Sequence, residues 1–352
     1  MNPAVSVCVP TYNRASTLSH TIEAMFEQTF SDWELIICDD ASPDGTEQVV
    51  RAFGDSRIHY YRNEKNLGLY PNWNHCIGLA SGKYIAIYHD HDLYLPTILE
   101  RSVALLEKYP TASFVHTALL LIDAVNDPVG VDIRPFPELM PGKKMKRLLA
   151  TSWASPIMAA TAMVRREAYK QVGPYHYQQY GLGCDMDMWF RLCEIGDVAY
   201  IRDPQVFIRA RTKGEKTAQF HWSEVTRNLH MHRDHLAREF EMNRLDYGLN
   251  RAKYVLQRDK QLLMYGIRAV LLESPEVNDE GYAVIQSEAS LCVRLLLKMT
   301  RGNNLSKSLL RYLALPLHRH KVSRLLDKHS QEARDYLESN GYLSNFLSVL
   351  RV

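Results

Sequence analysis

The sequence lacks any run of about 18 apolar residues, which is the length that a helix needs to cross a bilayer. Its first residues, MNPAVSVCVPTYNR, also lack the basic region followed by a long apolar stretch that marks a signal peptide. From these two absences we expect a cytoplasmic protein that neither spans a membrane nor is secreted by a signal peptide.

Cysteine is sparse and dispersed. The chain has six cysteines in 352 residues. None of them forms the close CxxC pair of a zinc site, and their density is far below that of a disulfide scaffold. Cys8 and Cys38 lie inside apolar runs and are interpreted as buried thiols. This usage fits a reducing compartment.

Net charge is also small. Lys and Arg total 42 against 40 Asp and Glu, a formal charge of +2, so the strongly basic composition of many nucleic-acid-binding proteins is excluded. We expect no nucleic-acid partner. Hydrophobic residues make up 46% and charged residues 23%, as in folded chains with a sizeable core. The length predicts a catalytic domain with an appendage.

The glycine-rich phosphate loops of dinucleotide enzymes and P-loop NTPases are missing as well. Neither GxGxxG nor GxxxxGK[ST] occurs in the N-terminal half, although these loops are the usual backbone cradles for phosphate groups. A nucleotide, if the protein binds one, must be held by other means.

The first hundred residues alternate between short apolar runs and segments of helical periodicity, the βαβ pattern of a parallel sheet. The fold class is therefore α/β. Strands are predicted at 5–9, 34–38, 57–61 and 84–88, and helices at about 16–28, 45–53, 72–80 and 97–108.

The pattern changes in the second half. Further strands at 112–117 and 158–164 predict a mixed sheet, and residues 123–142, rich in Pro, Asp and Gly, are predicted to form a loop. From about residue 220 onward the periodicity becomes helical. We therefore divide the chain into a catalytic domain at 1–219 and a helical C-terminal region at 220–352.

Acidic clusters follow two of the predicted strands. Asp39 and Asp40 end one strand, and Asp90-His91-Asp92 ends another. In open parallel sheets the ligand binds beyond the carboxyl ends of the strands. Carboxylates gathered there repel each other unless a cation joins them, and a divalent ion that bridges them to a diphosphate would also replace the missing glycine loop.

Five strings carry a more specific signal: VSVCVPTYNRASTL, ELIICDDASPDGT, NLGLYPNWN, ASGKYIAIYHDHDLYLP and CDMDMWFRL. In order and approximate spacing they resemble glycosyltransferase family 2, the inverting enzymes of the Rossmann-like GT-A fold, over about residues 3 to 212. The resemblance implies a nucleotide-sugar donor, a UDP-sugar first of all, and a glycan or lipid-linked acceptor. It also implies a role in cell-surface polysaccharide synthesis.

The resemblance implies a nucleotide site on the loops that follow the first strands. Pro10, Thr11 and Tyr12 would line it, and Asp40 would contact the base while Asp39 is its more buried, structural partner. The alternative for both aspartates is a pair of acidic caps on the following helix.

Four further residues complete the implied nucleotide site. Asn66 and Gly68 resemble the family's loop near the nucleotide, for which the alternative is a simple turn. Asp90 would reach the donor from the second acidic cluster. Arg211, with Arg209 and Lys213 beside it, matches the mobile basic element that the family supplies to the diphosphate, and the alternative is a solvated loop.

The metal motif departs from the family pattern. In this sequence His91 occupies the position of the family's usual metal-binding carboxylate. A search for the string DxD alone instead selects Asp90 and Asp92. Histidine binds transition ions such as manganese and suits magnesium poorly. We assign Asp90 and Asp92 as ligands with His91 as a further candidate, place His89 outside the ligand set, and expect Mn²⁺ or Mg²⁺. The alternative is a polar loop without an ion.

Asp185 in CDMDMWFRL resembles the acid of the family's ED motif, with Cys184 in place of the Glu. It is the candidate base that takes the proton of the acceptor hydroxyl. Asp187 is interpreted as an acid at a helix N-terminus. Three tryptophans are candidates for stacking on an acceptor sugar, with at least one expected in the core: Trp73, Trp153 and Trp189.

Two readings of other classes stay open. The missing Glu and the HDHD string also fit an inactive binding or scaffold module, and a nucleotidyltransferase is disfavoured because it gives the ED-like motif no role. The C-terminal region carries a basic, amphipathic stretch that predicts packing, homo-oligomerisation or peripheral contact with an anionic membrane. Its apolar positions are Leu305, Leu309, Leu310, Leu313 and Leu317.

Overall fold

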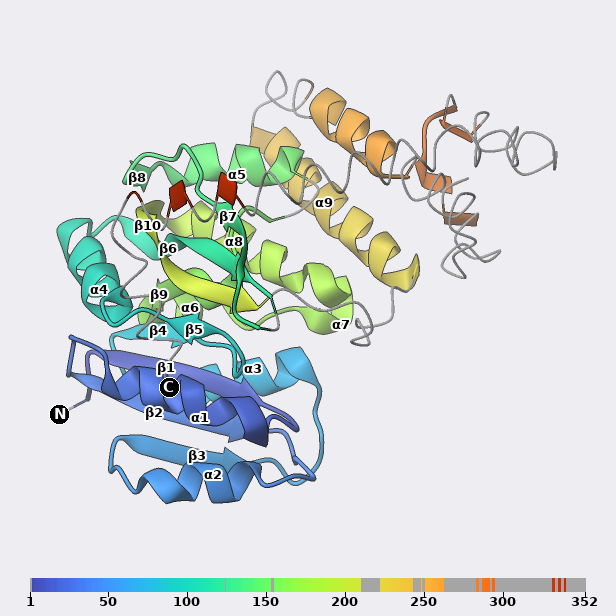
Figure 1. The fold of residues 1–352 in the computed structure, drawn as a ribbon. Helices are drawn as coiled ribbons and strands as arrows, with labels where there is room; N and C mark the ends of the chain where they lie inside the picture. Colours follow the sequence, from blue (N-terminus) through green and yellow to red (C-terminus); the bar gives the residue numbers. More distant parts are fainter. Residues whose placement is uncertain are drawn as a thin grey trace.

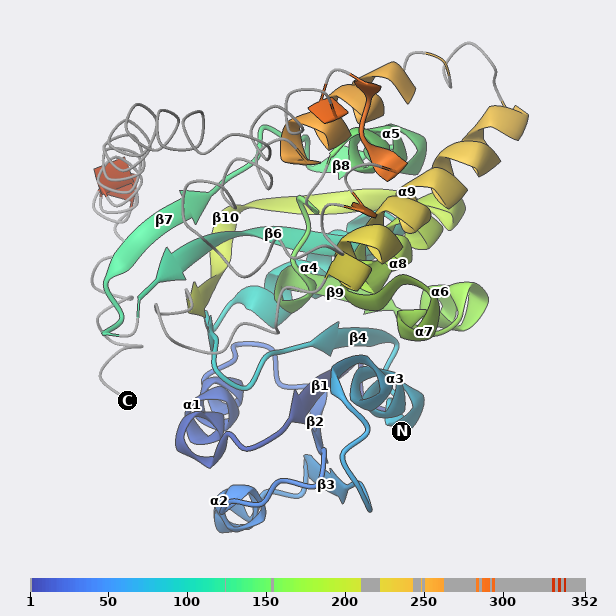
Figure 2. The ribbon, with the colours of Figure 1, turned by 90° about the vertical axis from the view of Figure 1, so that its right-hand side faces the viewer.

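A computed structural model describes residues 2–123, 125–152, 155–209, 222–242, 248, 251–262, 283–284, 287–291, 293–294, 331–332, 335–336 and 339. Within these residues one large mixed sheet is covered by helices on both faces (Figure 1, Figure 2). The order of the strands across the sheet is β3-β2-β1-β4-β9-β6-β10-β5, and β7 and β8 pair with β6 and β10 beside that path. The strand bounds are β1 Val5–Thr11, β2 Trp33–Asp39, β3 Ile58–Arg62, β4 Tyr84–Ile87, β5 Leu93–Tyr94, β6 Ala112–Ile122, β7 Pro128–Asp132, β8 Leu139–Met140, β9 Ala162–Arg165 and β10 Asp197–Arg209.

The N-terminal half of the sheet is parallel, as the sequence predicts. β1 lies between β2 and β4, and β3 pairs with the outer side of β2. Every residue of β1 is buried because helices cover both faces of the sheet. The register sets Thr11 opposite Asp39. The carboxyl ends of β1 and β2 therefore reach the same rim of the sheet, where their polar residues gather.

The second half of the sheet contains both parallel and antiparallel pairs, which confirms the mixed sheet predicted from the sequence. β9 is antiparallel to both β4 and β6, while β6 and β10 run parallel. The prediction of a loop at 123–142 is wrong, because β7 and β8 lie within this segment and pair antiparallel with β6 and β10. Both are short strands at the margin of the sheet: β7 contains Pro128 and Gly130, which hide the alternation that marks a strand, and β8 is only two residues long. The strand predicted at 158–164 starts later, after the 3₁₀ turn Ala159–Thr161.

The helices divide between the two faces. The bounds are α1 Ala15–Phe26, α2 Thr46–Phe53, α3 Leu69–Leu79, α4 Ile98–Lys108, α5 Gly142–Thr151, α6 Arg166–Val172, α7 Tyr177–Tyr180, α8 Cys184–Ile195 and α9 Trp222–Met242, with the 3₁₀ turn η2 at Gly181–Gly183. One core joins α1, α2 and α4 to the sheet, and the other joins α3, α5, α6, α8 and α9 to its opposite face. Leu18 of α1 and Trp189 of α8 are fully buried in these two cores.

Helix α9 follows the predicted domain boundary. Its Val225, Leu229 and Leu236 belong to the same core as α8. The division at residue 219 stays a prediction. The leucine stretch at 305–317 lies outside the described residues, so its membrane or oligomer role also stays a prediction. Among the described residues, no helix combines the length and the apolar character needed to cross a membrane.

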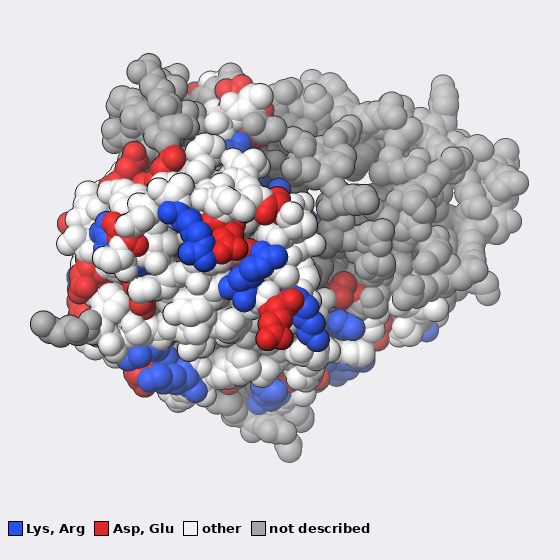
Figure 3. All heavy atoms as spheres, turned by 90° about the horizontal axis from the view of Figure 1, so that it is seen from below, with Lys and Arg blue, Asp and Glu red and all other residues white. Residues whose placement is uncertain are grey.

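Charged side chains are mixed in sign on the face at the bottom of Figure 1. In Figure 3, Lys and Arg are interspersed with Asp and Glu among the described residues of this face. Among the described residues, charged side chains also form close pairs, such as Arg57 with Asp55 and Arg51 with Glu47. The described side chains of this face therefore form no extended basic patch of the kind that binds a polyanion.

Candidate active site

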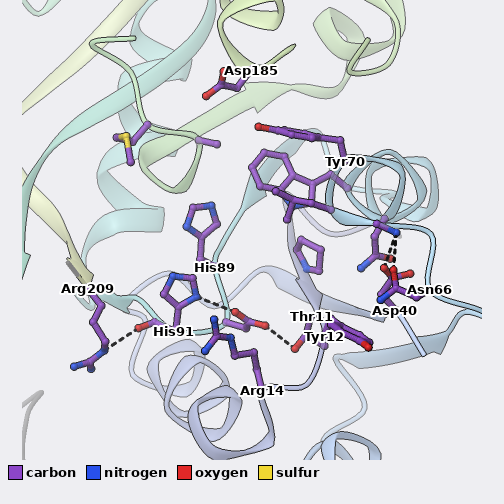
Figure 4. A pocket seen from close by; sticks show the side chains of 18 of the residues that line it. Thr11, Tyr12, Arg14, Asp40, Asn66, Tyr70, His89, His91, Asp185 and Arg209 are labelled. Atoms are coloured by element: carbon purple, nitrogen blue, oxygen red, sulfur yellow. Dashed lines mark hydrogen bonds and ion pairs between the residues drawn. The ribbon is translucent and has the colours of Figure 1, made fainter. Parts of the chain in front are cut away.

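A cleft of about 540 Å³ opens at the rim where the parallel strands end (Figure 4). Its walls come from segments that are far apart in the sequence: the ends of β1, β2 and β4, the start of α3, the N-terminus of α8 and the end of β10. The lining residues singled out from the sequence are Pro10, Thr11, Tyr12, Asp40, Asn66, Gly68, Trp73, Asp90, His91, Asp185 and Arg209. The cleft therefore lies beyond the carboxyl ends of the parallel strands, where the sequence analysis expects a ligand to bind.

The end of β1 forms one wall. Thr11 donates its hydroxyl to Asp90 Oδ2 at 2.7 Å, which ties the end of β1 to the loop after β4. Tyr12 is 48% exposed and lines the cleft. Arg14 is exposed and also lines the cleft. The sequence interpretation did not single out Arg14, although it stands in the string TYNR.

Asp39 and Asp40 have different environments. Asp39 is fully buried and accepts hydrogen bonds from Tyr60, Arg62 and the backbone N–H of Ser42, but it does not line the cleft. Asp40 lines the cleft. Neither residue caps α2, whose N-cap is Gly45. This matches the division into a structural and a cleft-facing aspartate.

Asp40 also shapes the loop that follows β3. Its carboxylate accepts hydrogen bonds from the Asn63 amide and from the backbone N–H groups of Leu67 and Gly68, at 2.7 to 2.9 Å. Gly68 has φ +89°, a backbone conformation that favours glycine. Asn66 accepts the same Gly68 N–H at 3.0 Å. The Asn66 and Gly68 turn is thus held against Asp40 at the cleft wall.

The loop after β4 pairs each histidine with an aspartate. His89 Nδ1 lies 2.9 Å from Asp92 Oδ2, and His91 Nδ1 lies 2.9 Å from Asp90 Oδ1. Asp92 has no exposed surface and does not line the cleft, and its Oδ1 accepts the Arg209 backbone N–H at 3.0 Å. Burial alone would raise the pKa of Asp92, but the hydrogen bond from His89 and the charges of both histidines hold it below its usual range.

Three residues of this loop could hold a metal ion. His89, His91 and Asp92 each offer one ligand atom, and these atoms lie within 4.8 Å of one another. The set differs from the predicted one, because it includes His89 and does not include Asp90. The Nε2 atom of His89 is buried and has no hydrogen-bond partner among the described residues. A nitrogen lone pair in that position fits a divalent cation.

Asp185 stands at the N-terminus of α8. It is partly exposed and faces the cleft, and Figure 4 shows it at the opposite end of the view from Arg14. Burial raises its pKa to about 6, although the backbone N–H of Met186 donates to its Oδ1 at 2.6 Å. Cys184, in the place of the family's Glu, is fully buried in the core. A carboxyl group with a pKa near neutrality is suited to accept a proton.

Asp187 has the structural position that the sequence predicts. It lies in the first turn of α8, is 1% exposed, and accepts hydrogen bonds from Arg191 and His235. His176 lies 3.2 Å from the same carboxylate. The negative charge of Asp187 is therefore paired with side chains inside the protein, and its carboxylate does not face the cleft.

The predicted tryptophans and basic residues also differ in whether they line the cleft. Trp189 is in the core, whereas Trp73 lines the cleft and packs edge-on against Tyr70 with ring centroids 5.0 Å apart. Arg209 lines the cleft, and its Nη1 donates to the Asp123 carbonyl at 3.1 Å. Arg211, Lys213 and Trp153 lie outside the described residues.

Comparison with known proteins supports a single family. The model of the family described as "Glycosyl transferase family 2" matches residues 6–173. The putative glycosyltransferase EpsE of Bacillus subtilis is 34% identical over 202 residues, which are 56% of this chain and 69% of EpsE. Escherichia coli WfgD, a UDP-Glc:alpha-D-GlcNAc-diphosphoundecaprenol beta-1,3-glucosyltransferase, is 36% identical over 104 residues, which are 30% of this chain and 41% of WfgD.

A solved structure agrees with the expected fold. The crystal structure of S. aureus TarS residues 1–349 in complex with UDP superposes with a TM-score of 0.59, at 12% identity, covering 91% of this chain and 92% of the other. This likeness concerns the fold. The expected GT-A architecture is thus confirmed.

Proposed function

Since this chain belongs to glycosyltransferase family 2, we propose that it transfers a sugar from a nucleoside-diphosphate sugar to an acceptor hydroxyl, with inversion. The observation that supports this most strongly is Asp185, whose pKa is raised to about 6 by burial and which faces the same cleft as the strand-end residues. A base and a nucleotide site that share one cleft are what direct displacement requires.

The donor would bind along the strand ends. The exposed ring of Tyr12 would stack on the base, and the loop that Asp40 holds also lines the cleft wall. Asp40 already accepts three hydrogen bonds from the chain, so its contact with the base would use a remaining lone pair. Arg14 and Arg209 would supply positive charge to the diphosphate, together with Arg211.

A divalent cation, Mn²⁺ or Mg²⁺, is the proposed cofactor. The side chains of His89, His91 and Asp92 after β4 support such an ion, since they offer two imidazoles and one carboxylate close together. When bound, the ion would neutralise charge that develops on the leaving diphosphate.

Asp185 would act on the acceptor side. Its ionised carboxylate takes the proton of the acceptor hydroxyl as the oxygen bonds to the anomeric carbon, while the bond from that carbon to the diphosphate breaks. Attack from the side opposite the leaving group inverts the anomeric centre. A base of this kind typically contributes about 10²- to 10⁴-fold.

The acceptor would bind against an apolar and aromatic wall near Asp185. Tyr70 and Trp73 line the cleft there, and Leu69 and Met158 in the lining are 56% and 40% exposed. Such a surface suits the apolar face of a sugar ring. WfgD takes a UDP-sugar and a lipid-diphosphate-linked sugar by its name. We therefore propose a UDP-sugar donor and a glycan or lipid-linked acceptor, in polysaccharide assembly.

The test begins with donor binding. Purified protein is heated with a panel of nucleotide sugars in the presence of Mn²⁺, because a ligand that binds the folded state raises its unfolding temperature. The stabilising donor is then incubated with and without simple sugar acceptors, and the anomeric configuration of the product is determined by NMR. Release of nucleoside diphosphate that depends on Asp185, with inversion, is expected.

Two results would contradict the proposed function. If a donor stabilises the protein but wild type and Asp185→Asn release no nucleoside diphosphate, the chain is a binding module, as the missing Glu at Cys184 would suggest. If no nucleotide sugar stabilises the protein, the proposed function is wrong.

A further inference from the structure

We propose that helix α9 positions the proposed catalytic base. In this inference Glu224 and His235 of α9 are positioning residues, which hold the chain on both sides of Asp185 and so fix where its carboxylate lies in the cleft. The inference rests on the proposed function, because it takes Asp185 as the base. It goes beyond that function by making transfer depend on residues of the predicted C-terminal region, 220–352.

The position of the Asp185 carboxylate depends on the backbone around it. Asp185 lies in the first turn of α8 and faces the cleft. Among the described residues, only backbone N–H groups donate hydrogen bonds to its carboxylate, and Met186 N lies 2.6 Å from Oδ1. A shift of this turn would therefore carry the carboxylate with it. A base must lie within hydrogen-bond reach of the proton that it takes, so such a shift would lower the rate of transfer.

On the N-terminal side of the base, α9 holds the turn η2. The carboxylate of Glu224 accepts a hydrogen bond from the backbone N–H of Leu182 at 2.7 Å. Close by, Tyr180 donates its hydroxyl to Oδ2 of Asp234 at 3.0 Å. Gly181 has φ +54°, and a Cβ atom there would collide with Oε2 of Glu224. Glycine therefore lets α9 approach this turn closely.

On the C-terminal side of the base, α9 holds the first turn of α8. Nε2 of His235 lies 2.9 Å from Oδ1 of Asp187. An ionised carboxylate can only accept, so the ring nitrogen is the donor. The His235 ring also stacks on Phe190, with centroids 4.2 Å apart and an angle of 9° between the planes. All three side chains are buried. A charge-assisted hydrogen bond in such a place is strong and fixes the turn.

The two contacts act from one helix. Leu182 precedes Asp185 by three residues and Asp187 follows it by two, so the base lies between two fixed points of the chain. Glu224 and His235 are eleven positions apart, which is about three helical turns, and they therefore lie on the same face of α9. Figures 1 and 2 show α9 beside α8, with which it shares a core. A misplacement of a catalytic group by about 1 Å can lower a rate about 10²-fold.

The experiment measures sugar transfer by full-length variants that separate the hydrogen bond of His235 from its packing. His235→Phe keeps the stack on Phe190 but removes the donor to Asp187, whereas His235→Gln keeps an N–H donor. We expect kcat of His235→Phe to fall about tenfold or more with donor affinity unchanged, and His235→Gln to regain part of the loss. Glu224→Ala and Glu224→Gln are a second pair, because glutamine keeps an oxygen that can accept from the Leu182 N–H.

A double-mutant cycle separates positioning from a general structural effect. If His235 acts through Asp185, adding His235→Phe to Asp185→Asn should lower transfer by less than about twofold, because the base that it positions is already gone. His230→Ala, which changes an exposed histidine of α9, is the matched control and should transfer sugar at the wild-type rate. Circular dichroism checks that each variant is folded. If His235→Phe does not fold, Glu224→Ala is taken through the same cycle, since its side chain is partly exposed.

Hydrogen exchange, followed by mass spectrometry, gives a measurement that needs no substrate. The backbone amides of residues 182–187 should exchange about tenfold or more faster in His235→Phe and Glu224→Ala than in wild type, because local opening of the turn becomes easier. Equal exchange in all three proteins would overturn the inference.

Two kinetic results would also overturn the inference: wild-type transfer rates in both His235→Phe and Glu224→Ala, or a loss from His235→Phe that is as large in the Asp185→Asn background as in wild type. A wild-type protein that transfers no sugar contradicts the proposed function and, with it, the catalytic role of α9. Hydrogen exchange then still shows whether α9 holds the turn, so the two failures are distinguishable.

Discussion

His235 of α9 places its Nε2 atom 2.9 Å from Oδ1 of Asp187, in the first turn of α8. Both side chains are buried, at 1% exposure each. Asp185, the proposed base, precedes Asp187 by two residues. The helix that follows the predicted catalytic domain is thus joined by a buried polar contact to the turn that carries the proposed base.

The first prediction concerns the stability that this contact provides. Asp187→Ala should lower the free energy of unfolding by about 3 to 5 kcal/mol, because it leaves buried Arg191 without its carboxylate partner and removes the acceptor of His235. Urea unfolding monitored by circular dichroism measures the change. Glu167→Ala is the matched control, since its pair with Lys170 is exposed, and it should change the free energy by less than about 1 kcal/mol.

A small effect of Asp187→Ala, equal to that of the control, would show that the α8–α9 contact does not contribute to the fold. The pH dependence provides a second check. Burial alone would raise the pKa of Asp187, but the hydrogen bond from His235 and the charge of Arg191 hold it below that of an ordinary aspartate. Its contribution to stability should therefore be lost only as pH falls below about 4.

The second prediction addresses Asp185 directly. Asp185→Asn keeps the size and polarity of the side chain but cannot accept a proton, so transfer should fall by about 10²-fold or more while donor affinity stays unchanged. Steady-state kinetics gives the rate, and calorimetry with the donor and Mn²⁺ gives the affinity. If donor affinity falls as far as the rate does, Asp185 binds the donor and is not the base.

The third prediction uses the raised pKa of Asp185. Because its folded pKa is about 6, kcat/KM of the wild type should rise about tenfold per pH unit below pH 6 and level off above pH 7. Between about pH 4 and pH 6 the folded state binds more protons at this carboxyl than the unfolded state does, so its ionisation lowers stability as pH rises. Asp185→Asn should then unfold at a higher temperature than wild type at pH 7.5, but not at pH 4.

Two measurements decide that prediction. Rates are taken with saturating Mn²⁺ from pH 5 to pH 8, and melting temperatures of both proteins are taken at pH 4 and pH 7.5. A profile without an inflection near pH 6, together with equal melting temperatures at pH 7.5, would contradict the raised pKa.

The sequence predicted those parts of the fold and cleft that depend on neighbours in the chain. Apolar runs identify β1, β2 and β4, and the polar residues that follow them do line one cleft, because parallel strands end at one rim. The edge strands β7 and β8 escaped prediction because only their pairing with β6 and β10 defines them. No local pattern signals such pairing.

The same limit explains what was missed in the site. The sequence does not reveal that Asp92 contacts His89 or that it accepts a hydrogen bond from the Arg209 backbone, 117 residues away. The contact of Asp187 with His235 spans 48 residues and depends on how α9 packs. Contacts of this kind arise from the packing of whole elements, so a pattern along the chain does not contain them.

The last prediction concerns Arg14, which follows the end of β1 at the cleft wall. Its exposed guanidinium lines the cleft near Thr11, in the view of Figure 4, and would meet the diphosphate of a donor held along the strand ends. Arg14→Ala should weaken binding of UDP by about 10- to 100-fold, since a charge-assisted hydrogen bond contributes about 1.5 to 3 kcal/mol, while binding of uridine should not change. Arg51→Ala is the control, because Arg51 pairs with Glu47 on the exposed side of α2. Calorimetry with UDP and with uridine separates the two contributions. Equal loss for both ligands would mean that Arg14 shapes the nucleoside site, and no loss for either would remove it from the donor site.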